Sequence, residues 1–134
     1  MNMTADQQPA SKLWIFAQDG LASLVGTTCA RCATVHFPAK PICTTCGSRQ
    51  VARAELSRNG VVFASTVVHR SFQGFKVPYC VGYVDLSEGV RVVGQLVGTA
   101  QPVIGSQAVL DIGPIRETEG RIVEGIRYRI VGSL

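Results

Sequence analysis

Residues 29–47 read CARCATVHFPAKPICTTCG, and this stretch decides the first part of the fold. It holds two Cys-x-x-Cys pairs, Cys29 with Cys32 and Cys43 with Cys46, separated by ten residues. Each pair forms a tight turn that aims two sulfur atoms at one point, and two such turns complete the tetrahedral sulfur shell that zinc prefers. The spacing therefore predicts a zinc ribbon with these four cysteines as metal ligands. Iron in a rubredoxin-like site is the minor alternative.

Four protein ligands leave no open coordination position, so the predicted metal is structural and not catalytic. Gly47, directly after the second pair, relieves crowding in its turn. The cations Arg31 and Lys40 would offset the negative charge of four thiolates and one divalent ion. His36 lies between the two pairs, but four cysteines already complete the shell, so a surface or packing role is expected for it.

The composition is that of a globular protein with one substantial core. The chain has 134 residues, of which 46 % are hydrophobic and 16 % are charged. No apolar run approaches the roughly 18–20 residues that a membrane-spanning helix needs. The start, Met1 to Ser11, is polar and lacks the apolar middle of a signal peptide. We therefore expect a cytoplasmic protein without a membrane anchor, in which paired cysteines stay reduced and bind metal.

The second half of the chain changes to a strand pattern. Alternating apolar and polar residues between Gly, Pro, Asp and Ser clusters indicate antiparallel strands. The turns Asn59-Gly60 and Ser87–Gly89 supply residues that suit tight connections. Five strands joined by short turns are typical of a small closed barrel such as the OB-fold. The five expected strands are Val61–His69, Tyr79–Leu86, Val90–Val97, Gln107–Ile112 and Arg121–Val131.

The N-terminal region is expected to differ from both modules. Met1 to Ala10 has the composition of a disordered start, and Ser11 to Ala22 is interpreted as a short helix with an apolar stripe. Its residues Trp14 and Phe16 either pack on the protein's own core or dock on a partner. The predicted fold class is therefore mainly β: a tail and helical segment at 1–25, a rubredoxin-like zinc ribbon at 26–50 and a five-stranded OB-fold domain at 58–134.

Two features of the predicted barrel bear on chemistry. Cys80 shares the inward parity of an apolar strand, which favours a small buried hydrophobe over a nucleophile, although His69 is close in sequence. The loop Ser71–Pro78 carries Phe75 and Lys76 after Arg70. Aromatic and basic side chains at a barrel mouth could stack an adenine ring and meet its phosphates. The alternative is a loop that covers the barrel end with its own aromatics.

Taken together, these residues resemble the acyl-CoA-associated zinc-ribbon/OB-fold family. The resemblance runs over roughly residues 11 to 131 and keeps the order of the elements. The residues that carry it are Cys29–Cys32, His36–Pro38, Pro41–Ser48, Gly60–Val62, Thr66–Arg70, Gly74-Phe75, Pro78-Tyr79 and Val90–Gly98.

The resemblance implies a role. Family members are small non-catalytic subunits beside acyl-CoA thiolases, ketoacyl-synthase-like acyltransferases and steroid side-chain aldolases, and the thiolase-fold partner holds the catalytic cysteine and histidine. The segment from Gly113 to Arg129 is similar to members paired with the thiolase of the benzylsuccinyl-CoA pathway of anaerobic aromatic degradation. Under this interpretation, CoA phosphates would meet basic residues near the barrel mouth or the ribbon. These residues are Arg70, Lys76, Arg31 and Lys40.

Two other classes of function stay open at this point. Zinc ribbons and OB-folds are both common in nucleic-acid-binding proteins. Against that function, the net charge is only +4 and the predicted strands show few aromatics interleaved with basic residues. An independent enzyme using Cys80, or an electron carrier with iron in the cysteine site, is the third class. The sequence shows no pairing of acid and base residues that would suit the former.

Overall fold

The computed structural model describes residues 13–71 and 74–132 of the chain. Within those residues the regular elements are β-strands. The described part of the chain has no helix that is long and apolar enough to cross a membrane. The chain divides into two compact units. The first runs up to Arg58 and includes Ser87–Val90, and the second comprises Asn59–Leu86 and the residues from Arg91 onward.

The first unit is built on one central strand. Strand β2 (Ala22–Cys29) pairs antiparallel with β1 (Trp14–Phe16) and β3 (Val35–His36), and also with β4 (Val51–Glu55). Five consecutive residues of β2, from 23 to 27, are buried, because the strand has neighbours on both edges. Among the described residues of this unit, few apolar ones outside the cysteine site are buried: Trp14, Leu24, Val25, Leu56 and Val90. Such a small core needs a further source of stability.

The helix expected at Ser11–Ala22 is wrong for the residues that the structure describes. Trp14 to Phe16 form β1, which pairs with Leu24 to Ala22 of β2 in a hairpin. The turn is made at Asp19-Gly20, where Gly20 has φ of 84° and Leu21 N–H donates to Asp19 Oδ1 at 2.9 Å. An Asp-Gly pair between apolar residues is a hairpin signal. The predicted disordered start, Met1 to Ala10, lies outside the described residues.

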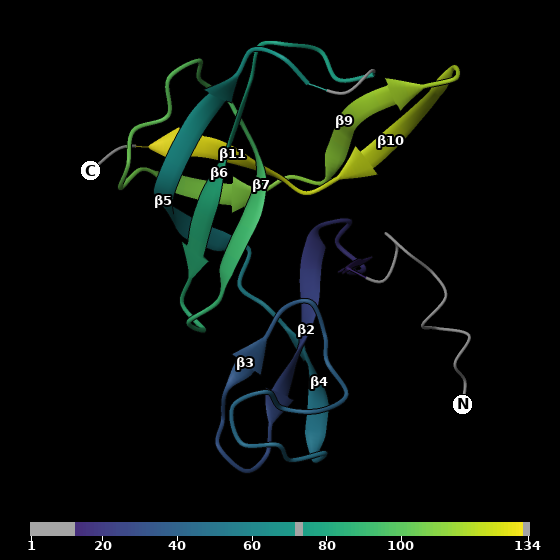
Figure 1. Ribbon diagram of the computed structural model, residues 1–134, viewed down its shortest axis with the longest axis vertical. Helices are drawn as coiled ribbons and strands as arrows, with labels where there is room; N and C mark the ends of the chain where they lie inside the picture. The colour runs from purple at the N-terminus through teal and green to yellow at the C-terminus, as the bar shows by residue number, and fades with distance from the viewer. Residues whose placement is uncertain (1–12, 72–73, 133–134) are drawn as a thin grey trace. The chain divides into compact units, whose positions relative to one another are not determined.

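The second unit is a closed five-stranded barrel, as predicted (Figure 1). Its strands are β5 (Asn59–Val68), β6 (Tyr79–Leu86), β7 (Arg91–Val97), β8 (Gln107–Leu110) and β11 (Arg127–Gly132). They follow one another around the barrel in the order β11-β7-β6-β5-β8, and β8 closes on β11. The pairing of β7 with β11 is parallel, and the others are antiparallel. This arrangement is the OB-fold.

The barrel interior is filled by inward residues of each strand. Val62, Val84, Val92, Leu96 and Tyr128 are all at most 3 % exposed. They alternate with outward residues, as the period of two requires. A bulge in β5 between Val62 and Ala64 interrupts this alternation.

The predicted last strand, Arg121–Val131, is two strands in the structure. Strand β10 (Arg121–Gly125) pairs with β9 (Gly113–Thr118) in a hairpin outside the barrel, and β11 enters the barrel after Ile126. The hairpin is visible beside the barrel in Figure 1. Ile126, Tyr128 and Ile130 continue the parity of Ile122, so the pattern does not reveal that the chain changes partners at Ile126.

An acidic residue at the end of β8 joins the barrel strands. Asp111 Oδ2 accepts hydrogen bonds from Arg127 at 3.0 Å and Arg129 at 2.8 Å. Partial burial acts to raise the pKa of Asp111, but hydrogen bonds from Arg129 and Arg127 outweigh it and the pKa is lowered. The ionised carboxylate therefore stabilises the junction of β8 with β11.

Gly82 is required by the close approach of β5 to β6. A methyl group at this position would meet the carbonyl oxygen of Ala64, and Leu96 Cδ1 at 2.8 Å. We expect Gly82→Ala to lower the free energy of unfolding by about 2–3 kcal/mol, because a backbone oxygen cannot move aside as a side chain can. Urea unfolding of the zinc-loaded protein measures it. Gly132→Ala is the matched control, since nothing lies within 4 Å of its added methyl; equal losses in both variants would contradict the prediction.

Asp111 gives the barrel a defined pH dependence. Its folded pKa lies below its unfolded value of about 3.9, so its contribution is fully present above that pH and is lost as pH falls through the folded pKa. An NMR titration of the carboxyl carbon should show a midpoint below the unfolded value. Asp111→Asn should cost about 1 kcal/mol of stability at neutral pH. Asp85→Asn, which removes the exposed ion pair with Arg91, should cost less.

Candidate metal centre

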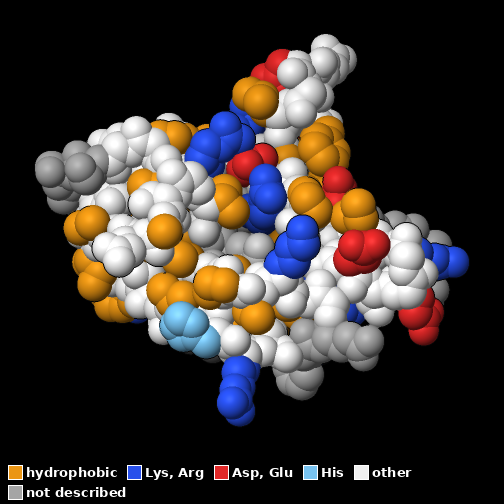
Figure 2. All heavy atoms as spheres, turned by 90° about the horizontal axis from the view of Figure 1, so that it is seen from above, with side chains coloured by type: hydrophobic (Ala, Val, Ile, Leu, Met, Phe, Trp, Pro, Cys, Tyr) orange, Lys and Arg blue, Asp and Glu red, His pale blue; other side chains and the backbone are white. Residues whose placement is uncertain are grey.

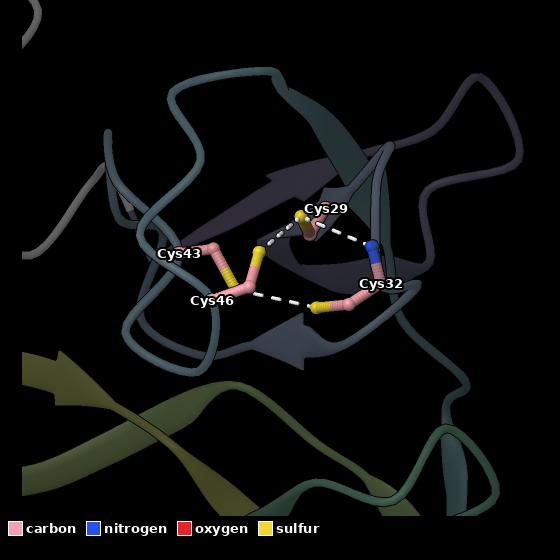
Figure 3. A group of neighbouring side chains, drawn as sticks. All are labelled: Cys29, Cys32, Cys43 and Cys46. Atoms are coloured by element: carbon pink, nitrogen blue, oxygen red, sulfur yellow. Dashed lines mark hydrogen bonds between the residues drawn. The ribbon is translucent and has the colours of Figure 1, made fainter.

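The four cysteines predicted from their spacing come together in the first unit (Figure 3). Cys29 is the last residue of β2, and Cys32 follows in the next turn. Cys43 and Cys46 lie in the connection between β3 and β4. Cys29 and Cys43 are buried, Cys46 is half-buried and Cys32 is exposed. The site is therefore closed on the side of the sheet and reaches the surface at Cys32.

The sulfur positions fit a tetrahedral ion. All four Sγ atoms lie within 4.8 Å of one another, and the pairs Cys29–Cys46 and Cys32–Cys43 are each 3.6 Å apart. A tetrahedron with zinc–sulfur bonds of about 2.3 Å has sulfur–sulfur edges of about 3.8 Å. Side-chain geometry and donor type thus both suit zinc.

The two cysteine turns share one backbone geometry. In the first, Ala33 N–H donates to Cys29 O at 2.9 Å, and in the second, Gly47 N–H donates to Cys43 O at 2.8 Å. Both closing residues have positive φ, 65° at Ala33 and 80° at Gly47. Glycine adopts this region freely, whereas alanine is strained in it. In the first turn Arg31 and Cys32 direct their N–H groups to Cys29 Sγ at 3.4 and 3.5 Å, as expected for a thiolate acceptor.

His36 contacts the cysteine cluster but is not one of the four residues that form it. It is 9 % exposed, and its Nε2 lies 3.5 Å from Cys43 Sγ. This agrees with the packing role expected for it, but its contact with a sulfur was not predicted. A ring N–H directed at a ligand sulfur stabilises the thiolate and fixes its position. The only sequence signal was the place of His36 between the two cysteine pairs.

Four thiolates in this cluster would need a cation among them. The hydrogen bond from His36, followed by the backbone N–H groups of Cys46 and Thr45, lowers the pKa of Cys43 to about 7. At Cys46 the backbone N–H of Ser48 acts to lower the pKa, but burial and the three neighbouring thiols outweigh it and raise the pKa to about 11. Four like charges this close cannot form together without a positive ion among them.

The basic residues predicted to meet CoA are divided between the two units. Arg31 is exposed within the first cysteine turn, and Lys40 is half-buried in the same unit, where its backbone N–H donates to Thr27 Oγ1 at 3.2 Å. Arg70 and Lys76 are exposed in the second unit. Lys76 lines a cavity there.

Cys80 is a buried barrel residue, 7 % exposed, and its thiol donates to Ala100 O at 3.4 Å. A backbone carbonyl cannot take a proton as a catalytic base does. The structure therefore agrees with the expectation that Cys80 is a small buried residue.

The fold and the cysteine cluster define a two-module class of protein, a zinc ribbon followed by an OB-fold. Comparison with family models agrees: residues 20–52 match the "ChsH2, rubredoxin-like zinc ribbon domain" and residues 54–111 match the "ChsH2, C-terminal OB-fold domain".

Comparison with individual proteins identifies the family of the chain. It is 32 % identical over 113 residues to a "DUF35 domain-containing scaffold protein" of Methanocaldococcus jannaschii, covering 79 % of this chain and 80 % of the relative. It is 37 % identical over 98 residues to "Benzoylsuccinyl-CoA thiolase subunit BbsA" of Geobacter metallireducens, covering 72 % of this chain and 66 % of that subunit. A solved "Ltp2-ChsH2(DUF35) aldolase" is 33 % identical, with a TM-score of 0.65, over 81 % of this chain and 84 % of that one. The chain belongs to the ChsH2/DUF35 family.

The alanine in the first cysteine turn offers a test of the turn geometry. Because Ala33 has positive φ, Ala33→Gly should raise the free energy of unfolding of the zinc-loaded ribbon by roughly 0.5–1 kcal/mol. The reverse change in the second turn, Gly47→Ala, should lower it by a similar amount. Thermal unfolding of both variants measures the effect. Destabilisation by Ala33→Gly would show that the turn does not strain the alanine.

The fifth cysteine supplies an internal control for the metal site. Cys43→Ser should lose bound metal and unfold the ribbon, because metal binding contributes roughly 10 kcal/mol or more in structural zinc sites. Cys80→Ala should keep one metal ion per chain, since Cys80 lies in the barrel unit. Elemental analysis of the purified variants measures the metal. Full metal content in Cys43→Ser would refute the assignment.

Proposed function

We propose that this chain is a non-catalytic, zinc-binding accessory subunit of a thiolase-type acyl-CoA complex in the cytoplasm. The observation that carries the proposal is the complete ribbon-plus-barrel architecture, shared with relatives that are named as a thiolase subunit and as a scaffold protein. The catalytic residues would belong to a thiolase-fold partner. This chain would support assembly of the complex and help to shape its acyl-CoA site.

In this proposal the metal is structural. Cys29, Cys32, Cys43 and Cys46 are its ligands, and a set of four thiolates leaves no position for substrate or water. Zinc, when bound, supplies the charge that allows four thiolates to share one centre. His36 and the backbone N–H groups of the first turn hold the sulfurs in place. The small apolar core of this unit makes its fold dependent on that ion.

The acyl-CoA of the complex is proposed to meet cations of this subunit. Arg70, Lys76, Arg31 and Lys40 are the residues proposed from the sequence, since guanidinium and ammonium groups suit phosphates. Arg70, Lys76 and Arg31 are exposed and Lys40 is half-buried.

A nucleic-acid-binding function is less well supported. Phe63 and Tyr83 are exposed on the barrel surface, 47 % and 48 %, and exposed aromatics can stack on bases. The cation beside them is already engaged: Arg91 lies 3.5 Å over the Phe63 ring and forms two hydrogen bonds with Asp85 at 2.7 and 3.1 Å. A phosphate would have to compete with that carboxylate.

An affinity pull-down from the native cell extract tests the proposal. The tagged, zinc-loaded chain is used as bait at moderate salt with nuclease added, and the captured proteins are identified by mass spectrometry. We expect a thiolase-fold protein in an amount comparable to the bait, and thiolase activity of the recovered complex but not of the bait alone. The Cys43→Ser chain should fail to recover the partner, and the Cys80→Ala chain should recover it.

Two outcomes would contradict the proposed function. Recovery of ribosomal or other nucleic-acid-binding proteins in place of a thiolase-fold protein would favour the binding-module function. A bait that turns over acyl-CoA by itself would contradict the non-catalytic role.

A further inference from the structure

One ligand sulfur of the metal centre is open to solvent, although a structural metal site does not need such access. On the face of the molecule that Figure 2 shows, basic and acidic side chains lie among one another, so charge alone selects no further site there. The cysteine cluster differs, because its members are chemically alike but unequally accessible. This inequality gives one of them a chemistry that the other three lack.

Cys32 is the cysteine that a dissolved reagent can reach. All five cysteines of the sequence lie in the described part of the chain, and among them Cys32 alone is exposed. Cys29 and Cys43 are 1 % and 0 % exposed. Oxidation by a peroxide requires a thiolate that the oxidant can reach. Since all four metal ligands are deprotonated when the ion is bound, exposure decides which of them reacts first.

A second sulfur lies within reach of Cys32. Cys32 Sγ is 3.6 Å from Cys43 Sγ, which belongs to the other cysteine turn (Figure 3). A disulfide between them would shorten this distance to about 2.05 Å. Cys29 and Cys46 have the same separation, 3.6 Å, but Cys29 is buried and accepts the N–H groups of Arg31 and Cys32, and Cys46 is half-buried. The pair of Cys32 and Cys43 therefore combines access for an oxidant with a neighbouring thiolate.

We propose that Cys32 is a peroxide-reactive modification site, and that its oxidation forms a Cys32–Cys43 disulfide that releases the metal. In the first step Cys32 Sγ attacks one oxygen of hydrogen peroxide. An S–O bond forms, the O–O bond breaks, and the departing hydroxide takes a proton from solvent and leaves as water. The product is the sulfenic acid of Cys32.

In the second step Cys43 Sγ attacks Cys32 Sγ. An S–S bond forms, the S–O bond breaks, and the second hydroxide takes a proton from solvent and leaves as water. The two cysteines together lose two electrons, and one hydrogen peroxide becomes two waters. The neighbouring thiolate of Cys43 thus diverts Cys32 from further oxidation to the sulfinic acid, which is not reversed by thiols.

The disulfide removes two of the four ligands from the metal centre. Cys29 and Cys46 remain as ligand thiolates, whereas a structural zinc site has four ligands. Because few apolar residues are buried in the described part of this unit, loss of the ion loosens the ribbon. The oxidation state of Cys32 therefore determines whether the ribbon keeps its metal. The inference rests on the metal centre and does not depend on a thiolase-type partner.

Treatment of the zinc-loaded full-length chain with hydrogen peroxide tests the inference. Zinc release is followed with a chromogenic chelator, and a sample without peroxide gives the background rate. Free thiols are alkylated at early times, and the disulfides are mapped by mass spectrometry of peptides. We expect one zinc ion released for each disulfide formed, Cys32–Cys43 as the first disulfide, and return of bound zinc when a thiol reductant and zinc are added. A Cys29–Cys46 disulfide that forms first, or zinc release without a disulfide, would overturn the inference.

Two histidine variants separate the exposed sulfur from the general reactivity of the cluster. Cys32→His and Cys46→His each leave three cysteines and one histidine, a ligand set that also binds structural zinc. Cys32→His should release zinc to peroxide about tenfold more slowly than the unmodified chain, because the exposed sulfur is absent. Cys46→His keeps both sulfurs of the reacting pair, so its rate should stay within about threefold of the unmodified chain. Equal slowing in the two variants would contradict the assignment to Cys32.

Elemental analysis first establishes that each variant holds one zinc ion. If a histidine variant fails to bind zinc, the disulfide map of the unmodified chain decides the question, since it needs no substitution. Cys80→Ala is a further control, because Cys80 lies in the barrel unit and is buried. Its zinc release should match that of the unmodified chain, and slower release would show that the oxidation involves Cys80 instead.

Discussion

Mutual repulsion of four thiolates around one point is the constraint on which the ribbon depends. Their sulfur atoms lie within 4.8 Å of one another, so the folded arrangement is favourable only when a cation is among them. The central strand β2 carries this constraint into the sheet, because it ends at Cys29 and pairs with β1, β3 and β4. Since the described part of this unit has a small apolar core, we expect folding of the ribbon to depend on metal binding.

The barrel unit is stabilised in the ordinary way, by apolar packing and strand pairing. Its interior is closed by Tyr128 and by valines of β5, β6 and β7. Asp111 adds a charged connection from the end of β8 to β11. Loss of metal thus acts on the ribbon, and acid below the unfolded pKa of Asp111 removes the contribution of this carboxylate to the barrel.

The parts of the fold that could be predicted are those with a strict local rule. Cysteine spacing fixes the ligand set, because a Cys-x-x-Cys turn has one geometry. Strand alternation identified all five barrel strands, with β6 predicted to its observed bounds.

A pattern of apolar residues gave a wrong prediction where two different structures fit it equally well. Trp14 to Phe16 are apolar in either a helix or a strand, and only Asp19-Gly20 indicates the hairpin. Ile122, Ile126, Tyr128 and Ile130 share one parity although the chain leaves one sheet and enters another at Ile126. The contact of His36 with Cys43 joins residues seven apart across an irregular connection, and the hydrogen bond from Glu117 N–H to Gly74 O joins residues far apart in sequence. No local rule predicts either contact.

The parallel pairing of β7 with β11 has a consequence for synthesis of the chain. A ribosome releases residues in order, and the ribbon has all its ligands by Cys46 and its last strand by Glu55. Its four cysteines can take up the ion while most of the barrel residues are still being made, although Ser87–Val90 of the same unit follow later. The barrel cannot close until Arg127 to Gly132 have emerged, because β11 joins β7 to β8. Its closure therefore depends on contacts distant in sequence, which form slowly. During that interval the nascent chain carries a complete set of metal ligands and an open sheet edge.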